Sequence, residues 1–294
     1  MADASAVPGA GSSALPLQVV RLKHPGRWIA AGVVVVLLVA LVSSLVTNER
    51  FRWDVVFGYL FSGSILLGLR NTLLLTVAAM VVGVLLGVLL AVARESRNPV
   101  LSGVAGAYVG FFRGTPLLVQ LIFWFNLSAL YPVISLGLPF GPSLALGSAN
   151  VLITPWVAAI LGLGLNEAAY MAEIVRAGLQ SVDAGQTQAA QALGMTGRQV
   201  FSRIVLPQAL RVIIPPTGNQ TISMLKTTSL VSVIALPELL FAAQIIYART
   251  YEVIPLLITA SLWYLALTTV LSIGQGFLER RLGRGDASRR RGVA

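Results

Sequence analysis

The chain has 294 residues, of which 56% are hydrophobic and only 11% are charged; soluble domains carry roughly a quarter of charged residues, so the composition indicates an integral membrane protein. It has no cysteine, which excludes disulfides, thiol catalysis and cysteine-ligated zinc. Its one histidine is His24. The net charge is +10, and the Lys and Arg residues lie between the apolar segments and at the C-terminal end. This is where they are expected when they set the orientation of a membrane protein, so we expect no nucleic acid partner.

Six apolar segments are long enough to cross a bilayer, which takes about 20 residues of helix. They cover residues 28–46, 67–93, 104–134, 151–172, 212–235 and 254–277. Residues 1–27, before the first segment, form a basic tail rich in Ala, Gly, Ser and Pro, a composition typical of disorder. Because no A-x-A cleavage site follows the first segment, we interpret it as an uncleaved membrane helix.

The third segment is interrupted at Gly114-Thr115-Pro116. Thr115 is a predicted N-cap with Pro116 at the first helical position, so we expect an interfacial piece followed by the true span. A Pro- and Gly-rich loop between residues 132 and 147 then separates this span from the fourth.

The distribution of Lys and Arg predicts the orientation, because cytoplasmic loops are enriched in both. With six spans and both termini in the cytoplasm, the inner segments hold 16 of the 21 Lys and Arg residues. This asymmetry places the loop 176–211 and the tail 279–294 in the cytoplasm. The tail has six arginines against two acidic residues, which favours contact with anionic lipid.

The loop 176–211 contains a predicted helical hairpin. Asp183 is a candidate N-cap with Gln186 as the third residue of its helix, a variant of the capping box. Gly194 is placed to end that helix in the left-handed conformation. The alanines of this helix form a small face that permits the close approach of a partner.

The second helix of the hairpin begins at a second capping box, Thr196 with Gln199. Phe201 and Ile204 are expected to anchor it against the membrane domain, and Pro207 is expected to follow its end. The alternative is an ordinary loop packed on its own protein.

The hairpin resembles the EAA loop of ATP-binding-cassette (ABC) importer permeases, in which Gln-Ala-Ala, three residues, Gly, nine residues and Ile-x-Leu-Pro follow one another. The matching residues, with Met195 beside the glycine, are Gln188, Ala189, Ala190, Gly194, Ile204, Leu206 and Pro207. Gln188 stands where the family usually has Glu. Four further stretches resemble the polar-amino-acid branch of these permeases: GLRNTLLLT (68–76), FFRGTPLLVQL (111–121), AAYMAEIVRAGLQSVDAGQ (168–186) and MLKTTSLVSVIALPEL (224–239).

The resemblance implies an all-α integral membrane protein with the type I ABC importer permease fold, in which five core transmembrane helices occupy residues 64–278 and the helix 28–46 is extra. It implies a multi-pass subunit of the bacterial inner membrane that transports polar amino acids. The implied partners are a second permease subunit, identical or related, two ABC ATPase subunits and an extracytoplasmic solute-binding protein. The hairpin would be the coupling helix that docks on the ATPase.

No cofactor is expected in this chain. A P-loop needs Gly directly before its Lys, and neither Lys23 nor Lys226 follows a glycine. ATP and Mg²⁺ are therefore expected in the partner ATPase, and the chain itself is not expected to be an enzyme.

Polar residues inside the spans are candidates for the substrate pathway. Asn219, Ser223 and Lys226 recur at i, i+4 and i+7 and share one helix face. Lys226 lies about 16 Å past Pro215 and Glu167 about 13 Å before Arg176 along their helices, so both are deep in the bilayer. Intramembrane charges usually face a cavity or each other.

We therefore expect Glu167 and Lys226 to flank the pathway and to meet the amino and carboxyl groups of an amino acid, or else to form a structural ion pair. Gln120, Asn219 and Ser229 are candidates for neutral hydrogen bonds there. Arg113, Glu173 and Arg176 are instead expected to form a structural ion-pair group. Two Gly-x-x-x-Gly pairs, 83/87 and 106/110, would allow close helix contact.

Three alternatives stay open. An ion-coupled secondary transporter of a small polar solute would use the Glu167–Lys226 pair and need no ATPase. A membrane-embedded enzyme would need a nucleophile–base pair or metal ligands, and the chain has neither H-E-x-x-H nor G-x-S-x-G. An assembly subunit would leave uptake specificity unchanged when polar residues in the spans are replaced.

Overall fold

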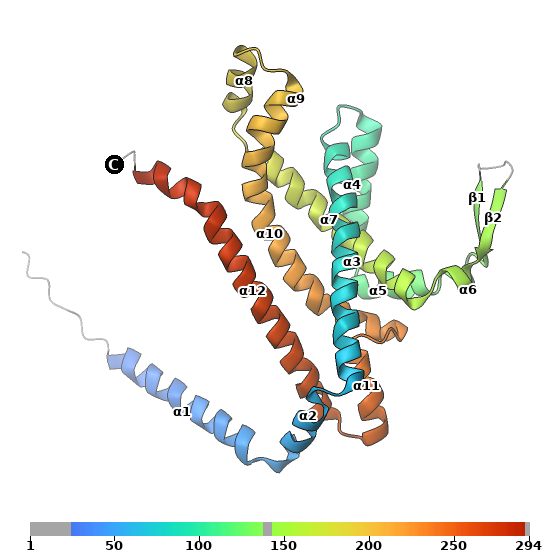
Figure 1. The fold of residues 1–294 in the computed structure, drawn as a ribbon, viewed down its shortest axis with the longest axis vertical. Helices are drawn as coiled ribbons and strands as arrows, with labels where there is room; N and C mark the ends of the chain where they lie inside the picture. Colours follow the sequence, from blue (N-terminus) through green and yellow to red (C-terminus); the bar gives the residue numbers. More distant parts are fainter. Residues whose placement is uncertain (1–24, 138–142, 292–294) are drawn as a thin grey trace, which may run out of the picture. The chain divides into compact units, whose positions relative to one another are not determined.

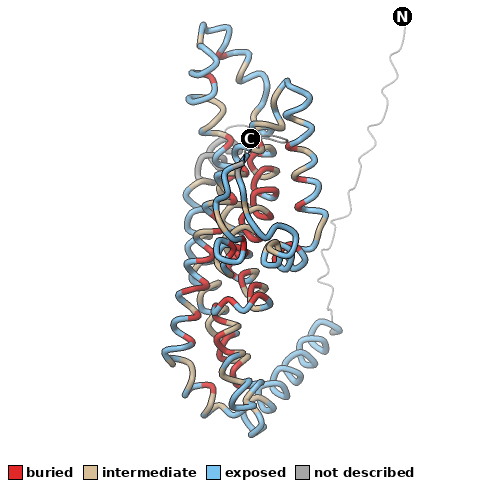
Figure 2. Tube along the Cα trace, turned by 90° about the vertical axis from the view of Figure 1, so that its right-hand side faces the viewer, coloured by how far each residue is buried: buried red, intermediate tan, exposed pale blue. Residues whose placement is uncertain are grey.

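The computed structural model describes residues 25–137 and 143–291, and the chain divides into two units, Met1–Phe51 and Arg52–Ala294. The first unit contains helix α1 (Pro25–Thr47) and a short 3₁₀ turn, η1 (Glu49–Phe51). The described side chains of α1 are exposed almost throughout (Figure 2), which suits a helix surrounded by lipid. Residues 25–27 of the predicted tail are helical, while the rest of that tail, with His24, lies outside the described residues.

The second unit is built from helices (Figure 1). Its α-helices are α2 (Trp53–Leu60), α3 (Gly63–Arg94), α4 (Pro99–Gly114), α5 (Leu117–Phe125), α6 (Ala149–Leu152), α7 (Pro155–Gln180), α8 (Ala184–Ala192), α9 (Gly197–Val200), α10 (Leu206–Thr227), α11 (Leu239–Thr250) and α12 (Val253–Arg291). Two 3₁₀ turns, η2 (Leu127–Ala129) and η4 (Thr228–Ile234), and a π-helical turn, η3 (Phe201–Val205), complete the helical elements. The unit begins at Arg52, and its first helix contacts α12, since the indole Nε1 of Trp263 in α12 donates to the carbonyl of Leu60 in α2 at 2.8 Å.

Helices α3 and α7 form the centre of this unit and run in the same direction. A Cβ built on Gly83 would lie 2.6 Å from Cγ of Glu167, and one built on Gly87 would lie 2.5 Å from Cβ of Met171. Since these distances are far below an ordinary contact, only glycine permits the two backbones to approach so closely. The expected close contact at 83/87 therefore exists, and it lies inside this chain.

Helix α10 runs antiparallel to α7, and α12 runs antiparallel to α10. The α7–α10 contact is again closed by a glycine, since a Cβ on Gly178 would lie 2.3 Å from Cγ1 of Ile213. Gln275 of α12 packs on Gly218 and donates to the carbonyl of Pro215 at 3.2 Å. The buried residues of the second unit lie along these helices and are coloured red in Figure 2.

The third predicted span is not one continuous helix. Helix α4 ends at Gly114 and α5 starts at Leu117 at an angle of 101°. Thr115 is extended and serves as the C-cap of α4 rather than as the N-cap of the next helix, which begins after Pro116. Because α3 and α7 are parallel, the chain between them must still return across the bilayer once, so α4 and α5 are the halves of a broken span.

The Pro- and Gly-rich loop contains strands that the sequence did not indicate. β1 (Val133–Gly137) and β2 (Ser143–Ser148) pair antiparallel, with Val133 opposite Ser148 and Gly137 opposite Ser143. The hairpin projects away from the helices in Figure 1. Residues 138–142, with Pro139, Gly141 and Pro142, lie outside the described residues.

The remaining spans match the predicted segments with shifted ends. Four helices of the described chain are long and apolar enough to cross a membrane, or six if each bent pair is one span. Thr154, whose hydroxyl accepts from Val157 N, starts α7 at Pro155 instead of residue 151. The basic tail predicted from residue 279 is helical as far as Arg291, because α12 continues to that residue.

Candidate functional site

The hairpin between the fourth and fifth spans is present, and its local structure follows from its caps. The Asp183 carboxylate accepts from Gly185 N at 2.7 Å and starts α8. Gly194, at φ +81°, ends that helix, and Met195 N donates back to the carbonyl of Ala190 at 3.2 Å. Thr196 and Gln199 form the predicted capping box at the start of α9.

The hairpin is joined rigidly to the fifth span, contrary to the prediction that Pro207 follows the end of a helix. The π-helical turn Phe201–Val205 connects α9 directly with α10, and Pro207 occupies the first turn of α10. Proline is tolerated there because the first amides of a helix lack intrahelical acceptors. One helical rod thus runs from Gly197 through Ile234, and Figure 1 shows the hairpin at its end.

The exposed surface of the hairpin differs from the predicted alanine face. Ala190 is only 4% exposed, as is Val200 of α9, so its side chain is not available to a partner. Gln188, Ala189 and Leu193 are exposed, and Leu193 is 84% exposed although it is a large apolar residue. Such a residue at the tip of a compact knob is typical of a contact site. Leu193 was not among the residues predicted from the sequence, because the small residues alone suggested a contact face.

The two anchors and the rest of the motif lie at the base of the hairpin. Phe201 is 48% exposed and is therefore only partly packed on the membrane domain. Ile204, Leu206 and Met195 are partly buried, and Leu206 lines an apolar groove between the helices.

The predicted polar face of the fifth span exists on α10. Asn219, Ser223 and Lys226 are all exposed, and in the described part of the chain Lys226 forms no ion pair. Ser229, in the following 3₁₀ turn, is partly buried and donates its hydroxyl hydrogen to the carbonyl of Lys226 at 2.7 Å. This face therefore offers one ammonium, one amide and one hydroxyl at helical spacing, a set that can bind a carboxylate.

Glu167 does not pair with Lys226. It is 5% exposed on α7, and its carboxylate accepts from Nε2 of Gln220 on α10 at 3.3 Å. Gly83 of α3 leaves the space in which the Glu167 side chain lies. Gln220, which is partly buried, lies on the face of α10 turned to α7, whereas Asn219, Ser223 and Lys226 are exposed.

Gln120 lies in the corner between α4 and α5 rather than beside Asn219. It is 5% exposed, and its Nε2 donates to the carbonyl of Phe112 at 3.0 Å and to Oγ1 of Thr115 at 2.7 Å. Its Oε1 accepts from Asn166 of α7 at 3.2 Å. These bonds satisfy the carbonyls that the 101° bend frees, so Gln120 holds the corner.

The expected ion-pair group is present and contains one more arginine. Glu173 pairs with Arg94, with Arg176 at 2.9 Å and with Arg113 at 3.9 Å. The carboxylate thereby ties the ends of α3 and α7 to α4. The fourth member is Arg94. It directly follows the predicted span 67–93, and this position could have indicated from the sequence that it lies near the other three.

A second buried carboxylate lies past the end of α10 that is away from the hairpin. The sequence alone did not indicate a role for it. Glu238 is fully buried and caps α11, accepting from Leu240 N at 2.9 Å and Phe241 N at 2.8 Å. Tyr264 of α12 donates to it at 2.8 Å. Ala235, at φ +56°, makes the turn between η4 and this cap, so Glu238 stabilises the break in the fifth span.

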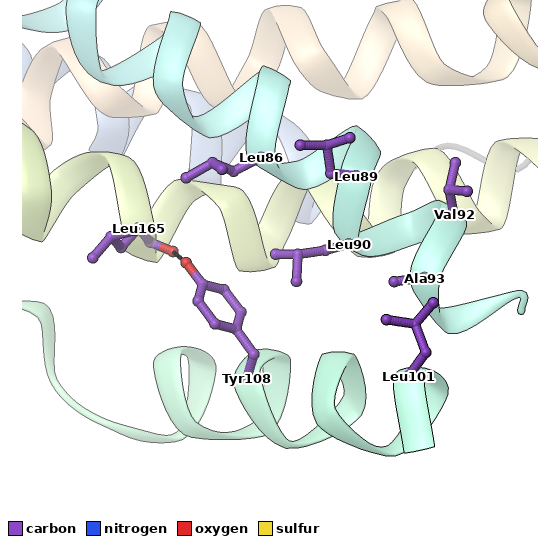
Figure 3. Close-up of a pocket in the computed structure, with 8 residues that line it drawn as sticks. All are labelled: Leu86, Leu89, Leu90, Val92, Ala93, Leu101, Tyr108 and Leu165. Carbon is purple, nitrogen blue, oxygen red and sulfur yellow. Dashed lines mark hydrogen bonds between the residues drawn. The ribbon is translucent and has the colours of Figure 1, made fainter. Parts of the chain in front are cut away.

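A groove on the second unit is almost entirely apolar. The groove in Figure 3, about 530 Å³, lies between α3, α4 and α7, and the hydroxyl of Tyr108 that faces it donates to the carbonyl of Leu165 at 2.9 Å. Its other lining side chains are aliphatic, so it offers nothing to a polar solute.

Comparisons with known proteins agree with this architecture. Residues 83–284 match the family model of the "Binding-protein-dependent transport system inner membrane component". The chain is 45% identical over 290 residues to the arginine transport system permease protein ArgU of Corynebacterium glutamicum, covering 97% of this chain and 90% of that relative. It is 38% identical to the L-cystine transport system permease protein TcyB of Bacillus subtilis, covering 82% of this chain and 95% of the relative.

Solved structures share the fold. A chain of the amino acid ABC transporter crystallised with histidines matches with a TM-score of 0.63 and 36% identity, over 74% of this chain and 94% of that chain. A chain of the methionine ABC transporter MetNI, in an inward-facing conformation, matches with a TM-score of 0.56 at 21% identity, over 75% of this chain and 97% of that chain.

Proposed function

The chain belongs to the family of inner membrane components of binding-protein-dependent transport systems, a family of ABC importer permeases with the type I fold, and from this premise we propose that it carries a polar amino acid. The names of its relatives support this substrate class, since they include permeases for arginine and for L-cystine. The match to the arginine permease spans 97% of the chain and therefore extends over helix α1.

The family implies an ATPase and a solute-binding protein as partners. We propose that ATP and Mg²⁺ bind to the ATPase, that two permease subunits, identical or related, pair in the membrane, and that both termini lie in the cytoplasm. The excess of arginine at the end of the bundle where α3 and α7 terminate supports this orientation.

One observation carries the coupling proposal: the hairpin and the polar face of α10 belong to one helical rod. Gly197 and Lys226 are about 44 Å apart along a straight helix of this length. A rigid rod transmits a displacement of the hairpin to the face that bears Asn219, Ser223 and Lys226, whereas a flexible loop would absorb it. We propose that Gln188, Ala189 and Leu193 form the contact with the ATPase, beside the left-handed turn at Gly194.

The coupling proposal is tested by Leu193→Glu, with Leu144→Glu as a control, because Leu144 is 70% exposed on the β-hairpin. Co-purification of the ATPase and ATP-driven arginine uptake into vesicles are measured. We expect the hairpin variant to lose at least tenfold in both, as a charge placed in an apolar contact does. Undiminished capture and uptake in Leu193→Glu would overturn the proposal.

The substrate pathway is a separate proposal on the exposed face of α10. Lys226 would meet the carboxylate of the amino acid, and Asn219 and Ser223 would hydrogen-bond to it, while Glu167 acts from behind through Gln220. Lys226→Ala should lower uptake at least tenfold and leave ATPase capture unchanged, and Ser272→Ala, on the exposed side of α12, should change neither. Equal uptake in both variants would contradict the role of Lys226.

The same vesicles distinguish the secondary-transporter alternative. If the chain alone accumulates amino acid under an ion gradient, without the ATPase, the ATP-driven importer is the wrong mechanism. That alternative expected Glu167 to pair with Lys226, whereas Glu167 accepts a hydrogen bond from Gln220.

A further inference from the structure

A second apolar groove, about 470 Å³, opens between α3, α7, α10 and α12 at the base of the hairpin. Its lining includes Phe201, Leu210 and Leu278, which are 48%, 39% and 42% exposed. Three large apolar side chains from the hairpin base and two antiparallel helices thus share an open concave surface, and only two threonine hydroxyls among the lining groups are polar.

The groove extends inward from one end of the bundle. Val92 lines it two residues before the end of α3, and Leu179 lines it one residue before the end of α7. Val84 and Thr221 lie deeper along α3 and α10. From Leu206 to Thr221 the groove follows α10 for about 22 Å, the depth of one leaflet and part of the next.

Two arginines lie beside the groove, each one helical turn from a lining residue. Arg211 precedes Ile214 by three residues on α10, and Arg281 follows Leu278 by three residues on α12, so each shares a face with its neighbour in the groove. The guanidinium of Arg281 lies 4.8 Å from the ring centroid of Phe277, which orients it.

Both arginines are exposed, and neither forms a salt bridge within the described residues. The acidic residue closest in sequence, Glu279, instead accepts a hydrogen bond from Nε2 of Gln275 at 2.8 Å. Among the described residues, the apolar groove is therefore flanked by two arginines that no carboxylate pairs with.

We propose that this groove binds an anionic phospholipid, with an acyl chain against the apolar walls and the headgroup phosphate between Arg211 and Arg281. Basic pockets between membrane helices on the cytoplasmic side select such headgroups. Arginine is suited to phosphate because its guanidinium donates two parallel hydrogen bonds. The inference needs only the membrane location of the bundle and is independent of the substrate.

The groove in Figure 3 provides a comparison, in which the neighbouring charges rather than the apolar lining determine whether a groove selects an anionic headgroup. It has a similar volume and lining, but the turn beside it contains both Glu95 and Arg97, and the neighbouring Arg94 is paired with Glu173. Without an excess of free cations at its end, that groove is expected to accept lipid chains without choosing a headgroup.

The experiment is native mass spectrometry of the purified full chain, titrated with phosphatidylglycerol or phosphatidylcholine of the same acyl chains. The wild type should bind phosphatidylglycerol more tightly. In R211Q/R281Q the affinity for phosphatidylglycerol should fall about thirtyfold, from the attraction of two arginines near an anionic headgroup, while that for phosphatidylcholine is unchanged. Arg97→Gln, which removes one exposed cation at the same end of the bundle, should retain the preference.

Filling the groove separates the acyl chain from the headgroup. Leu210→Trp should weaken both lipids, whereas Leu101→Trp, which fills the groove of Figure 3, should leave the preference for phosphatidylglycerol intact. A preference that survives R211Q/R281Q overturns the proposal. So does a disulfide-linked dimer of Leu278→Cys in this otherwise cysteine-free chain, because the groove would then be covered by a second copy.

Discussion

In the contact between α3 and α7, we expect a single added methyl group to destabilise the protein most at Gly87, in the variant Gly87→Ala. The added Cβ would lie 2.5 Å from Cβ of Met171, 3.0 Å from the carbonyl oxygen of Ala168 and 3.1 Å from the amide nitrogen of Ala172. The latter two are backbone atoms, which cannot rotate away. Because carbon atoms pack at about 3.5–4.0 Å, the two helices would have to separate by about 1 Å.

The magnitude follows from two opposing contributions. Overpacking of this kind costs about 1–3 kcal/mol of unfolding free energy. Replacing glycine by alanine inside a helix stabilises by about 0.5–1 kcal/mol. Gly106→Ala is the matched control, since a Cβ at Gly106 in α4 meets no atom within 4 Å and receives only the second contribution. We therefore expect Gly87→Ala to be less stable than Gly106→Ala by about 1–3 kcal/mol.

The measurement is reversible unfolding of the purified chain in mixed micelles, followed by circular dichroism as the denaturing detergent fraction is raised. A difference of 1.4 kcal/mol corresponds to about tenfold in the unfolding equilibrium constant, which such titrations resolve. Unfolding of the two variants at the same detergent fraction would show that α3 and α7 do not pack so closely at Gly87.

Three further substitutions test the polar contacts. Glu173→Gln leaves three arginines without their carboxylate and should lower the unfolding free energy by about 1.5–3 kcal/mol in the same titration, whereas Glu279→Gln should change it by less than about 0.5 kcal/mol. Thr196→Ala removes the capping box and should lower the stability of α9 by about 1 kcal/mol. Amide hydrogen exchange in α9 should then be about fivefold faster, while exchange in α7 is unchanged. The same exchange rates in α9 of the variant and the wild type would show that the cap does not stabilise this helix. Gln120→Leu leaves the carbonyl of Phe112 short of one donor and should cost about 1–3 kcal/mol; wild-type stability would show that the α4–α5 corner holds without it.

The helical hairpin was predictable because its signals are local. The cap at Asp183, the left-handed glycine at 194 and the box at Thr196 each act within a few residues, so a linear sequence contains all that they require. The glycine pair 83/87 was likewise visible, although its partner was not. Where a pattern is closed within one or two turns of helix, the chain specifies its own local structure.

The misassigned features all depend on contacts between distant segments. The length and hydropathy of residues 104–134 fit one span, but the bend at Thr115 is stabilised by Gln120 and Asn166, which lie on other helices or beyond the turn. Ala190 matched a motif, and only the pairing of α8 with α9 showed that it is buried.

The amino-acid sequence by itself determined that this is a multi-pass helical membrane protein with a capped hairpin between two spans, because composition, period and caps are properties of neighbouring residues. Only the tertiary structure decided which carboxylate meets which partner. Glu167 and Lys226 are both deep in the bilayer by residue count, yet the rotation of α10 about its axis turns Gln220 toward Glu167 and Lys226 away. That rotation is set by the glycine contact between α7 and α10, across some 35 residues of chain, and no local pattern records it.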